Sequence, residues 1–230
     1  MREFWDERAR EDAFYFVDNR INYKDPGEAQ RFWDMGRTDL NWILGELNLT
    51  LTSDQVVVEI GCGVGRLTRV IAERVASVKA LDVSTQMLEL AQRENPQLAN
   101  VEWIHGDGMS LAGIDDASAD VVISHVVFQH IPDPRITLGY VREVGRVLRP
   151  GGVTALVLSN LPAVHEWSPS LRERMRVLIG RAPGGQTHEA WLGSSIDLDD
   201  LRAAAADGGM EIEQYVGGGT QFMLVRLRRV

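Results

Sequence analysis

Short hydrophobic runs alternate with amphipathic stretches along most of this chain of 230 residues. The runs predict strands near residues 56–60, 77–82, 101–105, 120–124, 153–158, 210–216 and 221–228. Apolar residues at three- and four-residue spacing predict helices near residues 66–75, 85–94, 135–148, 170–179 and 198–206. Such alternation is typical of a mostly parallel sheet with helices on both faces. The pattern predicts a doubly wound α/β fold with a seven-stranded sheet.

Both ends of the chain depart from this alternation. Residues 217–219 are glycines and leave room only for a turn, so the last strand is expected to run antiparallel in a hairpin. An amphipathic helix is predicted near the N-terminus from apolar positions at helical spacing: Phe32, Trp33, Leu40, Ile43, Leu44 and Leu47. The aromatic and polar stretch before it, from Phe14 to Tyr23, is expected to be a loop that serves as a lid or docking segment.

The segment that tells most about function is residues 56–65, which read Val-Val-Val-Glu-Ile-Gly-Cys-Gly-Val-Gly. The apolar residues around Glu59 predict a short buried strand, and the three glycines predict a turn that leads into a helix. Because glycine has no Cβ, such a turn lets the backbone approach a ligand closely. A dinucleotide-binding turn requires a further glycine at position 66, where this chain has Arg66. The spacing therefore disfavours a nicotinamide-dependent oxidoreductase.

An acidic residue followed by alternating glycines resembles motif I of the class I S-adenosylmethionine-dependent methyltransferases. Four further segments resemble later motifs of that family in the expected order: residues 80–88, 106–109, 120–125 and 148–152. The resemblance spans residues 54–160 and implies a Rossmann-like fold. It also implies that the cofactor is S-adenosyl-L-methionine and that the product is S-adenosyl-L-homocysteine.

Each residue that the resemblance assigns to the cofactor has an ordinary structural alternative. Asp82 is expected to bind the ribose hydroxyls or to cap a helix, and Asp107 to bind the adenine amino group or to brace a turn. Glu59 is expected near the cofactor's ammonium group, or as a brace of the glycine turn. The candidates for the methionine carboxylate, each of which is also an ordinary surface residue, are Arg66, Arg37 and Arg20. The full expected set is Glu59, Gly61, Cys62, Gly63, Gly65, Arg66, Asp82, Val83, Met87, Gly106, Asp107, Gly108, Met109, Ser124, Tyr23 and Arg37.

The segment after the fourth predicted strand is expected to face the transferred methyl group. Its His125 and His130 are the candidate general bases, and bracing of the loop is the alternative for His130. No histidine has a carboxylate partner that the sequence reveals. An acceptor pocket is expected from Tyr15, His165, Trp167, His188 and Trp191. The acceptor is expected to be a partly apolar small molecule, such as a secondary metabolite, that is methylated on oxygen or nitrogen; a non-catalytic S-adenosylmethionine-binding regulatory or partner protein is the alternative.

Composition limits the kinds of molecule that this protein is expected to bind. The formal net charge of −9 argues against general affinity for nucleic acid or anionic membranes. The single cysteine, Cys62, excludes an internal disulfide and a multi-cysteine metal site, and no histidine cluster has metal spacing. The acidic start does not resemble a signal peptide, and no stretch approaches about 18 apolar residues, so a cytoplasmic protein is expected. The oligomeric state stays open.

The whole chain is expected to form one methyltransferase domain with four parts. These are a helical lid or docking segment at residues 1–50, a cofactor-binding core at residues 51–160, an acceptor-pocket insertion at residues 161–196, and a final helix and hairpin at residues 197–230. The chain has enough length for one full hydrophobic core and shows no internal repeat.

Overall fold

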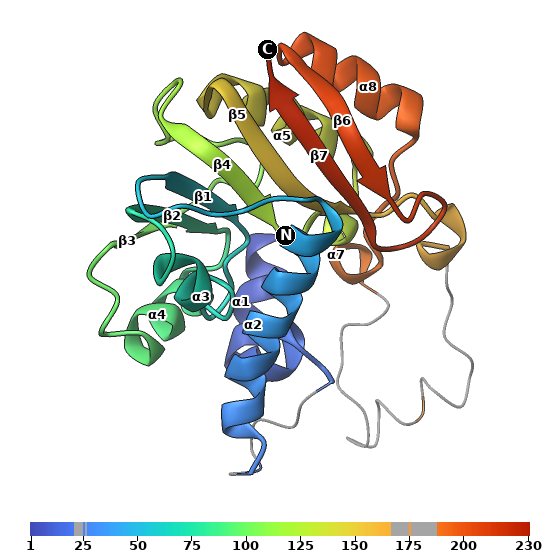
Figure 1. Cartoon of the computed structure of the whole chain (residues 1–230). Coiled ribbons are helices and arrows are strands. Elements are labelled where there is room, and N and C mark those ends of the chain that lie inside the picture. The colour runs from blue at the N-terminus through green and yellow to red at the C-terminus, as the bar shows by residue number, and fades with distance from the viewer. Residues whose placement is uncertain (21–24, 26, 167–174, 176–187) are drawn as a thin grey trace.

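A mixed seven-stranded sheet forms the centre of the computed structural model, which describes residues 1–20, 25, 27–166, 175 and 188–230 (Figure 1). The strands are β1 Val56–Ile60, β2 Ser77–Asp82, β3 Val101–His105, β4 Ala119–Ser124, β5 Leu148–Leu158, β6 Met210–Val216 and β7 Met223–Arg229. Their order is β3-β2-β1-β4-β5-β7-β6, and β1 to β5 pair in parallel. Strand β7 runs antiparallel to both β5 and β6, which confirms the predicted terminal hairpin.

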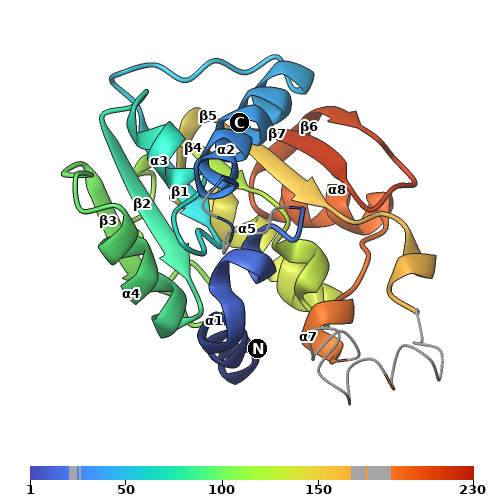
Figure 2. The same ribbon diagram turned by 90° about the horizontal axis from the view of Figure 1, so that it is seen from below.

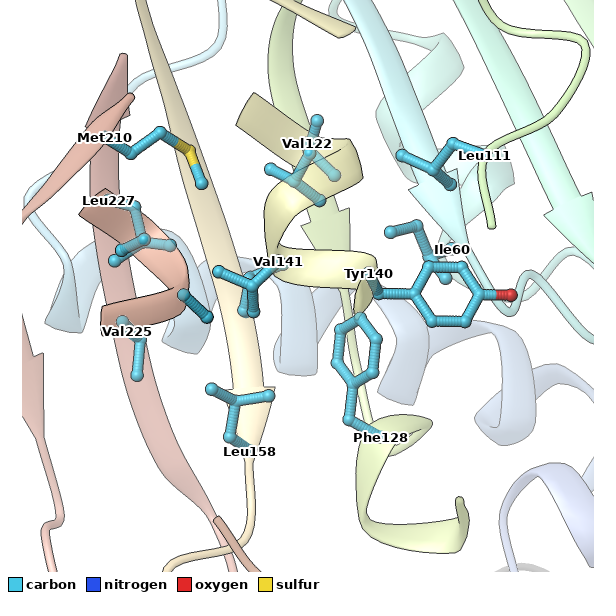
Figure 3. Close-up of a cluster of buried hydrophobic side chains, with 14 of the residues drawn as sticks. Ile60, Leu111, Val122, Phe128, Tyr140, Val141, Leu158, Met210, Val225 and Leu227 are labelled. Atoms are coloured by element: carbon cyan, nitrogen blue, oxygen red, sulfur yellow. The ribbon is translucent and has the colours of Figure 1, made fainter. Parts of the chain in front are cut away.

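Helices cover both faces of the sheet. They are α1 Arg2–Val17, α2 Ala29–Glu46, α3 Thr68–Ala72, α4 Thr85–Glu94, α5 Pro134–Val147, α7 Glu189–Leu192 and α8 Leu198–Asp207, with 3-10 turns η1 Phe128–His130 and η2 Pro162–Val164. Side chains alternate between the faces of a strand, so Val57 joins the core beneath α2 and α3 whereas Val58 joins the core beneath α5 and α8. Figure 3 shows the latter core, where Phe128 and Tyr140 pack edge to face beside Ile60. None of the helices described here has the length and apolar character needed to cross a membrane.

The N-terminal stretch differs from the expectation of a loop. Residues 14–16 belong to α1, a helix with a kink at Asp12. It folds as a helix because Ala9 and Ala13 bury one side of it, in a contact with Phe32 of α2 and Met87 of α4. Figure 2 shows α1 lying between α4 and α7.

Smaller differences concern two other elements. Helix α3 covers only residues 68–72 of the predicted 66–75, because residues 64–67 continue the turn. Strand β5 begins at Leu148, five residues before its predicted start, because Leu148 already pairs with Ala119 ahead of a register shift. Of the helix predicted at 170–179, all residues but 175 lie outside the described part of the chain.

Candidate active site

A cavity lies at the carboxyl ends of β1, β2 and β4. Its wall comes from the glycine turn after β1, the segments that follow β2, β3 and β4, and helix α1. Ligands of open α/β sheets bind at this edge, because the loops there converge in space. The part of α1 that faces the cavity consists of Trp5, Phe16 and Val17, preceded by Met1.

The glycine turn requires glycine at two positions in the wall. Gly61 and Gly63 have φ angles of 74° and 54°, in the left-handed region that side chains disfavour. A Cβ on Gly61 would lie 2.3 Å from Cγ2 of Val127. The N–H groups of Gly61 and Cys62 both donate to the carbonyl oxygen of Leu81, at 2.7 and 2.9 Å. The turn is therefore fastened to the end of β2 with its backbone exposed to the cavity.

Asp82 links this turn to α4. Its Oδ2 accepts a hydrogen bond of 2.8 Å from Gly63 N, and its Oδ1 accepts one of 2.8 Å from Ser84 N. Each carboxylate oxygen keeps a second lone pair for a ligand donor. The cap of α4 is Ser84, whose Oγ accepts from Met87 N. Burial raises the pKa of Asp82.

Glu59 is a second acid in the wall. Its side chain is buried, and Oε2 accepts a hydrogen bond from the hydroxyl of Thr68. Burial raises the pKa of Glu59 to about 7, while Thr68 and Arg66 oppose that shift and Asp82 adds to it. A positively charged ligand group in the cavity would favour the ionised carboxylate.

Four charged side chains from three segments meet around Arg66 of the wall. Asp39 Oδ2 lies 2.6 Å from both Arg66 Nη1 and Arg20 Nη2. Asp18 Oδ2 lies 3.3 Å from Arg66 Nη1 and 2.6 Å from Arg20 Nη2. Burial favours a raised pKa for Asp39, but the neighbouring His125 and the two arginines hold that pKa well below its ordinary value. This ion cluster ties α2 and the end of α1 to the glycine turn.

Asp39 was missed by the sequence analysis, although the position of this residue indicates that its carboxylate is paired. Asp39 lies on the buried stripe of α2, between Gly36 and Leu40. A carboxylate on the apolar face of a helix is costly unless it is paired. At Gly36, α2 approaches the turn so closely that a Cβ would lie 2.6 Å from the carbonyl oxygen of Arg66.

The two candidate histidines differ in their partners, and one of them has a carboxylate neighbour that the sequence does not reveal. His125 Nε2 lies 3.6 Å from Asp39 Oδ2, a contact that the fold creates between residues far apart in sequence. His130 Nδ1 lies 2.8 Å from the carbonyl oxygen of Trp191 and donates to it. Burial lowers the pKa of His125 and lowers that of His130 to about 4.

Residues 58–156, which contain the glycine turn, Asp82 and both histidines, match the family model for a methyltransferase domain. The chain carries a class I S-adenosylmethionine-dependent methyltransferase domain.

Curated relatives match this methyltransferase domain over its core. An uncharacterized methyltransferase of Mycobacterium tuberculosis is 34% identical over 111 residues, which are 48% of this chain and 54% of that protein. The demethylmenaquinone methyltransferase of Staphylococcus epidermidis is 33% identical over 109 residues, 46% of this chain and 44% of that protein. The matches thus span about half the length of these relatives.

Solved structures show the same fold. The magnesium protoporphyrin IX methyltransferase of Synechocystis PCC 6803, solved with bound S-adenosylhomocysteine, aligns with a TM-score of 0.62 at 20% identity, over 100% of this chain and 98% of that one. An S-adenosylmethionine-dependent methyltransferase from Mesorhizobium loti gives a TM-score of 0.61 at 21% identity, over 82% of this chain and 97% of that one.

Most of the expected cofactor residues and both candidate bases lie in the cavity wall of the methyltransferase domain. They are Glu59, Gly61, Cys62, Gly63, Arg66, Asp82, Val83, Met87, Gly106, Gly108, His125 and His130. Cys62 is buried there, and burial raises the pKa of its thiol, so the thiolate is disfavoured and a packing role fits.

Other expected cofactor residues are engaged elsewhere. Asp107 is exposed beside the wall, and its Oδ1 accepts 2.7 Å hydrogen bonds from Met109 N and Ser110 N, as in an ordinary turn. Arg37 pairs with Glu73 on the surface at 2.7 Å. Also outside the wall are Gly65, Met109 and Ser124; the Ser124 hydroxyl donates to Ile60 O. Tyr23 lies outside the described residues.

None of the described residues that were expected to form the acceptor pocket lies in the cavity wall. Tyr15 packs on Phe16, and His188 stacks on Phe4 and caps α7. His165 binds Ser159 and Leu192. Trp191 lies behind the wall, with its ring 5.2 Å from His130 and 6.5 Å from Trp5. Trp167 lies outside the described residues.

Proposed function

We propose that this chain binds S-adenosylmethionine in the cavity and transfers its methyl group to the oxygen or nitrogen of a small-molecule acceptor. The observation that carries the proposal is the combination of Gly61, Gly63, Asp82 and Glu59 in one cavity wall of a methyltransferase domain. The glycines offer exposed backbone, and the two carboxylates offer acceptors for hydroxyl and ammonium groups.

The chemistry of the wall fits the parts of the cofactor. Asp82 has free lone pairs for the two ribose hydroxyls, and buried Glu59 gains from a nearby ammonium group. Arg66 Nε is buried without a hydrogen-bond partner in the part of the chain that the structure describes, so it is available to the methionine carboxylate. Val83 and Met87 supply apolar surface for the adenine ring.

Bound S-adenosylmethionine supplies a methyl group on a positively charged sulfur, which is the reactive chemistry. The task of the chain is then to align the acceptor with that methyl group and to exclude water. One side of the cavity is apolar and is suited to holding the acceptor and to excluding water. It consists of Trp5, Phe16, Val127 and Ile131. An acceptor with apolar surface is consistent with that side, and the names of the demethylmenaquinone and magnesium protoporphyrin IX methyltransferases support a small-molecule acceptor.

Isothermal calorimetry followed by an acceptor screen tests the proposal. The purified chain should bind S-adenosylmethionine and S-adenosylhomocysteine with micromolar affinity, about −8 kcal/mol, and should show no preference for a nicotinamide dinucleotide. Labelled cofactor should then deliver its methyl group to a member of a panel of phenols, quinols and amines. Tight binding without turnover on any acceptor would favour the non-catalytic alternative, and preference for a dinucleotide would overturn the proposal.

A further inference from the structure

One histidine of the cavity wall is held on one side by a carboxylate and lacks a partner on the other. Nε2 of His125 faces Asp39 Oδ2 at 3.6 Å. Nδ1 of the same ring is buried and has no hydrogen-bond partner among residues 1–20, 25, 27–166, 175 and 188–230. A buried polar atom without a partner is costly, so a group bound in the cavity is the natural partner of Nδ1.

The carboxylate decides which nitrogen carries the proton. An ionised carboxylate only accepts hydrogen bonds, so the neutral imidazole presents N–H at Nε2 toward Asp39. The lone pair then lies on Nδ1, the nitrogen without a partner. The 3.6 Å separation is longer than a normal hydrogen bond, and catalytic contacts of this kind shorten when ligands bind.

We propose that Asp39 is a positioning residue that keeps the lone pair of His125 on Nδ1, and that His125 removes the proton of the acceptor. The proposal rests on the proposed function. As the acceptor oxygen or nitrogen forms its bond to the methyl carbon, the methyl–sulfur bond breaks and its electron pair stays on sulfur. The acceptor proton moves to Nδ1, and His125 later releases it to solvent.

The charged groups around His125 favour its neutral form, which is the form that can accept a proton. The charged groups that face His125 are Asp39 from α2, Arg66 from the glycine turn and Arg20 from the segment after α1. Burial lowers the pKa of His125, both arginines add to that shift, and Asp39 opposes it. Because Asp39 is already paired with two guanidinium groups, it orients the ring without drawing a proton onto it at neutral pH.

His130 is the competing base in the same wall. Its Nδ1 is fixed by the carbonyl oxygen of Trp191, and burial lowers its pKa to about 4. A carbonyl fixes a tautomer but stabilises the protonated ring less than a carboxylate does. The geometry therefore assigns the proton transfer to His125.

Nitrogen-15 NMR of the wild-type protein without cofactor tests the tautomer directly. The shift of Nε2 in His125 should be that of a protonated ring nitrogen, and the shift of Nδ1 that of a nitrogen with a lone pair. The opposite assignment would overturn the proposal. This measurement requires neither a variant nor an acceptor, so its outcome is independent of whether the chain binds S-adenosylmethionine.

A pair of aspartate variants on α2 tests the effect on turnover. Asp39→Asn should mix the two tautomers, lower the pKa of His125 and lower kcat about 100-fold or more, with cofactor affinity kept within about threefold. Asp34→Asn is the matched control, because Asp34 is exposed on the same helix and its carboxylate accepts from the exposed Gln30 side chain. It should change none of these quantities.

Two further variants separate positioning from folding. Asp39→Glu keeps the charge and should restore the tautomer and part of kcat, whereas a purely structural loss in Asp39→Asn would leave the NMR tautomer unchanged. His125→Ala should lower kcat by 100- to 10,000-fold and should make the further change Asp39→Asn nearly neutral for kcat. A wild-type tautomer in Asp39→Asn, or an unchanged kcat in His125→Ala, would overturn the proposal. A wild type that fails to bind S-adenosylmethionine would instead overturn the proposed function.

Discussion

The hydroxyl of Thr68 donates a hydrogen bond of 2.5 Å to Oε2 of Glu59, a carboxylate that the fold buries in the cavity wall. One donor does not replace the water that Glu59 loses, and burial raises its pKa to about 7. Glu59 is therefore neutral below that pH and charged above it, and both stability and ligand binding should depend on this change.

Replacement of Glu59 should stabilise the protein at alkaline pH. The folded state binds the Glu59 proton more tightly than the unfolded chain, whose pKa lies near 4.5. Glu59 thus destabilises the fold as pH rises from about 4.5 to about 7, and the full loss, about 3 kcal/mol, persists above that range. Glu59→Gln keeps the acceptor for Thr68 and should have little effect on the melting temperature at pH 4 but raise it at pH 8. A difference that is the same at both pH values would contradict the raised pKa.

The same ionisation should make cofactor affinity depend on pH. The ammonium group of S-adenosylmethionine favours ionised Glu59, so affinity of the wild type should rise as pH increases from 6 to about 7.5. Calorimetry across this range should show the rise in the wild type and a nearly flat profile in Glu59→Gln. A parallel rise in the variant would mean that another group titrates.

The two candidate acids of the cofactor site should differ in their effect on binding. Asp82 lies in the cavity wall, and its carboxylate is paired with the glycine turn, whereas Asp107 is exposed and braces its own turn. Asp82→Asn should weaken S-adenosylmethionine and S-adenosylhomocysteine equally, about 10- to 100-fold, because both contain the ribose. Asp107→Asn should change either affinity by less than about threefold. Equal losses in the two variants would mean that the Asp107 loop rearranges to bind adenine.

The contrast between Asp82 and Asp39 shows how far the sequence predicts this molecule. Asp82 was recognisable because it ends a hydrophobic run behind a glycine turn, and the observed bounds of β1 and β2 equal the predicted ones. The place of Asp39 on the apolar face of α2 marks it as a paired carboxylate, but its partners Arg66 and His125 were not recognisable, because they meet it only after α2 packs on the sheet edge. Tertiary contacts between distant residues leave no local pattern.

The extent of helix α1, which continues through the expected loop at Phe14 to Phe16, was not predicted for a different reason. Charged residues interrupt its apolar face, and small Ala9 and Ala13 carry much of the packing against α2 and α4. Sequence patterns detect large apolar side chains at helical spacing far better than small ones. The contribution of Trp5 and Phe16 to the cavity was therefore visible only in the structure.

Replacement of two glycines of α2 by alanine should change the stability of the protein in opposite directions. A Cβ at Gly36 would lie 2.6 Å from the carbonyl oxygen of Arg66, so Gly36→Ala must displace backbone and should cost about 1–3 kcal/mol. A Cβ at Gly45 has no atom within 4 Å, so Gly45→Ala should stabilise the helix by up to about 1 kcal/mol. Urea unfolding measures both. Equal stability of the two variants would mean that α2 is not held tightly against the glycine turn.

His130 should prove structural rather than catalytic. Its Nδ1 donates to Trp191 O, and its ring packs at 5.5 Å from Trp5, so it joins η1 to α7 and α1. His130→Ala should keep cofactor affinity within about threefold and lower turnover by less than about 100-fold, because a bracing role contributes less than a general base. The thermal stability should fall by about 1 kcal/mol for the lost hydrogen bond.

His165→Ala is the matched control for this result. His165 also binds a carbonyl of α7, that of Leu192, but lies outside the cavity wall. If both histidines only brace α7, the two variants should lose similar amounts of stability. Any fall in turnover should then also be similar in the two variants, although only His130 lies in the cavity wall. A loss near 10,000-fold in His130→Ala alone, with unchanged cofactor affinity and partial recovery at high pH, would instead make His130 the base, because only a group that accepts the acceptor proton is replaced in part by hydroxide.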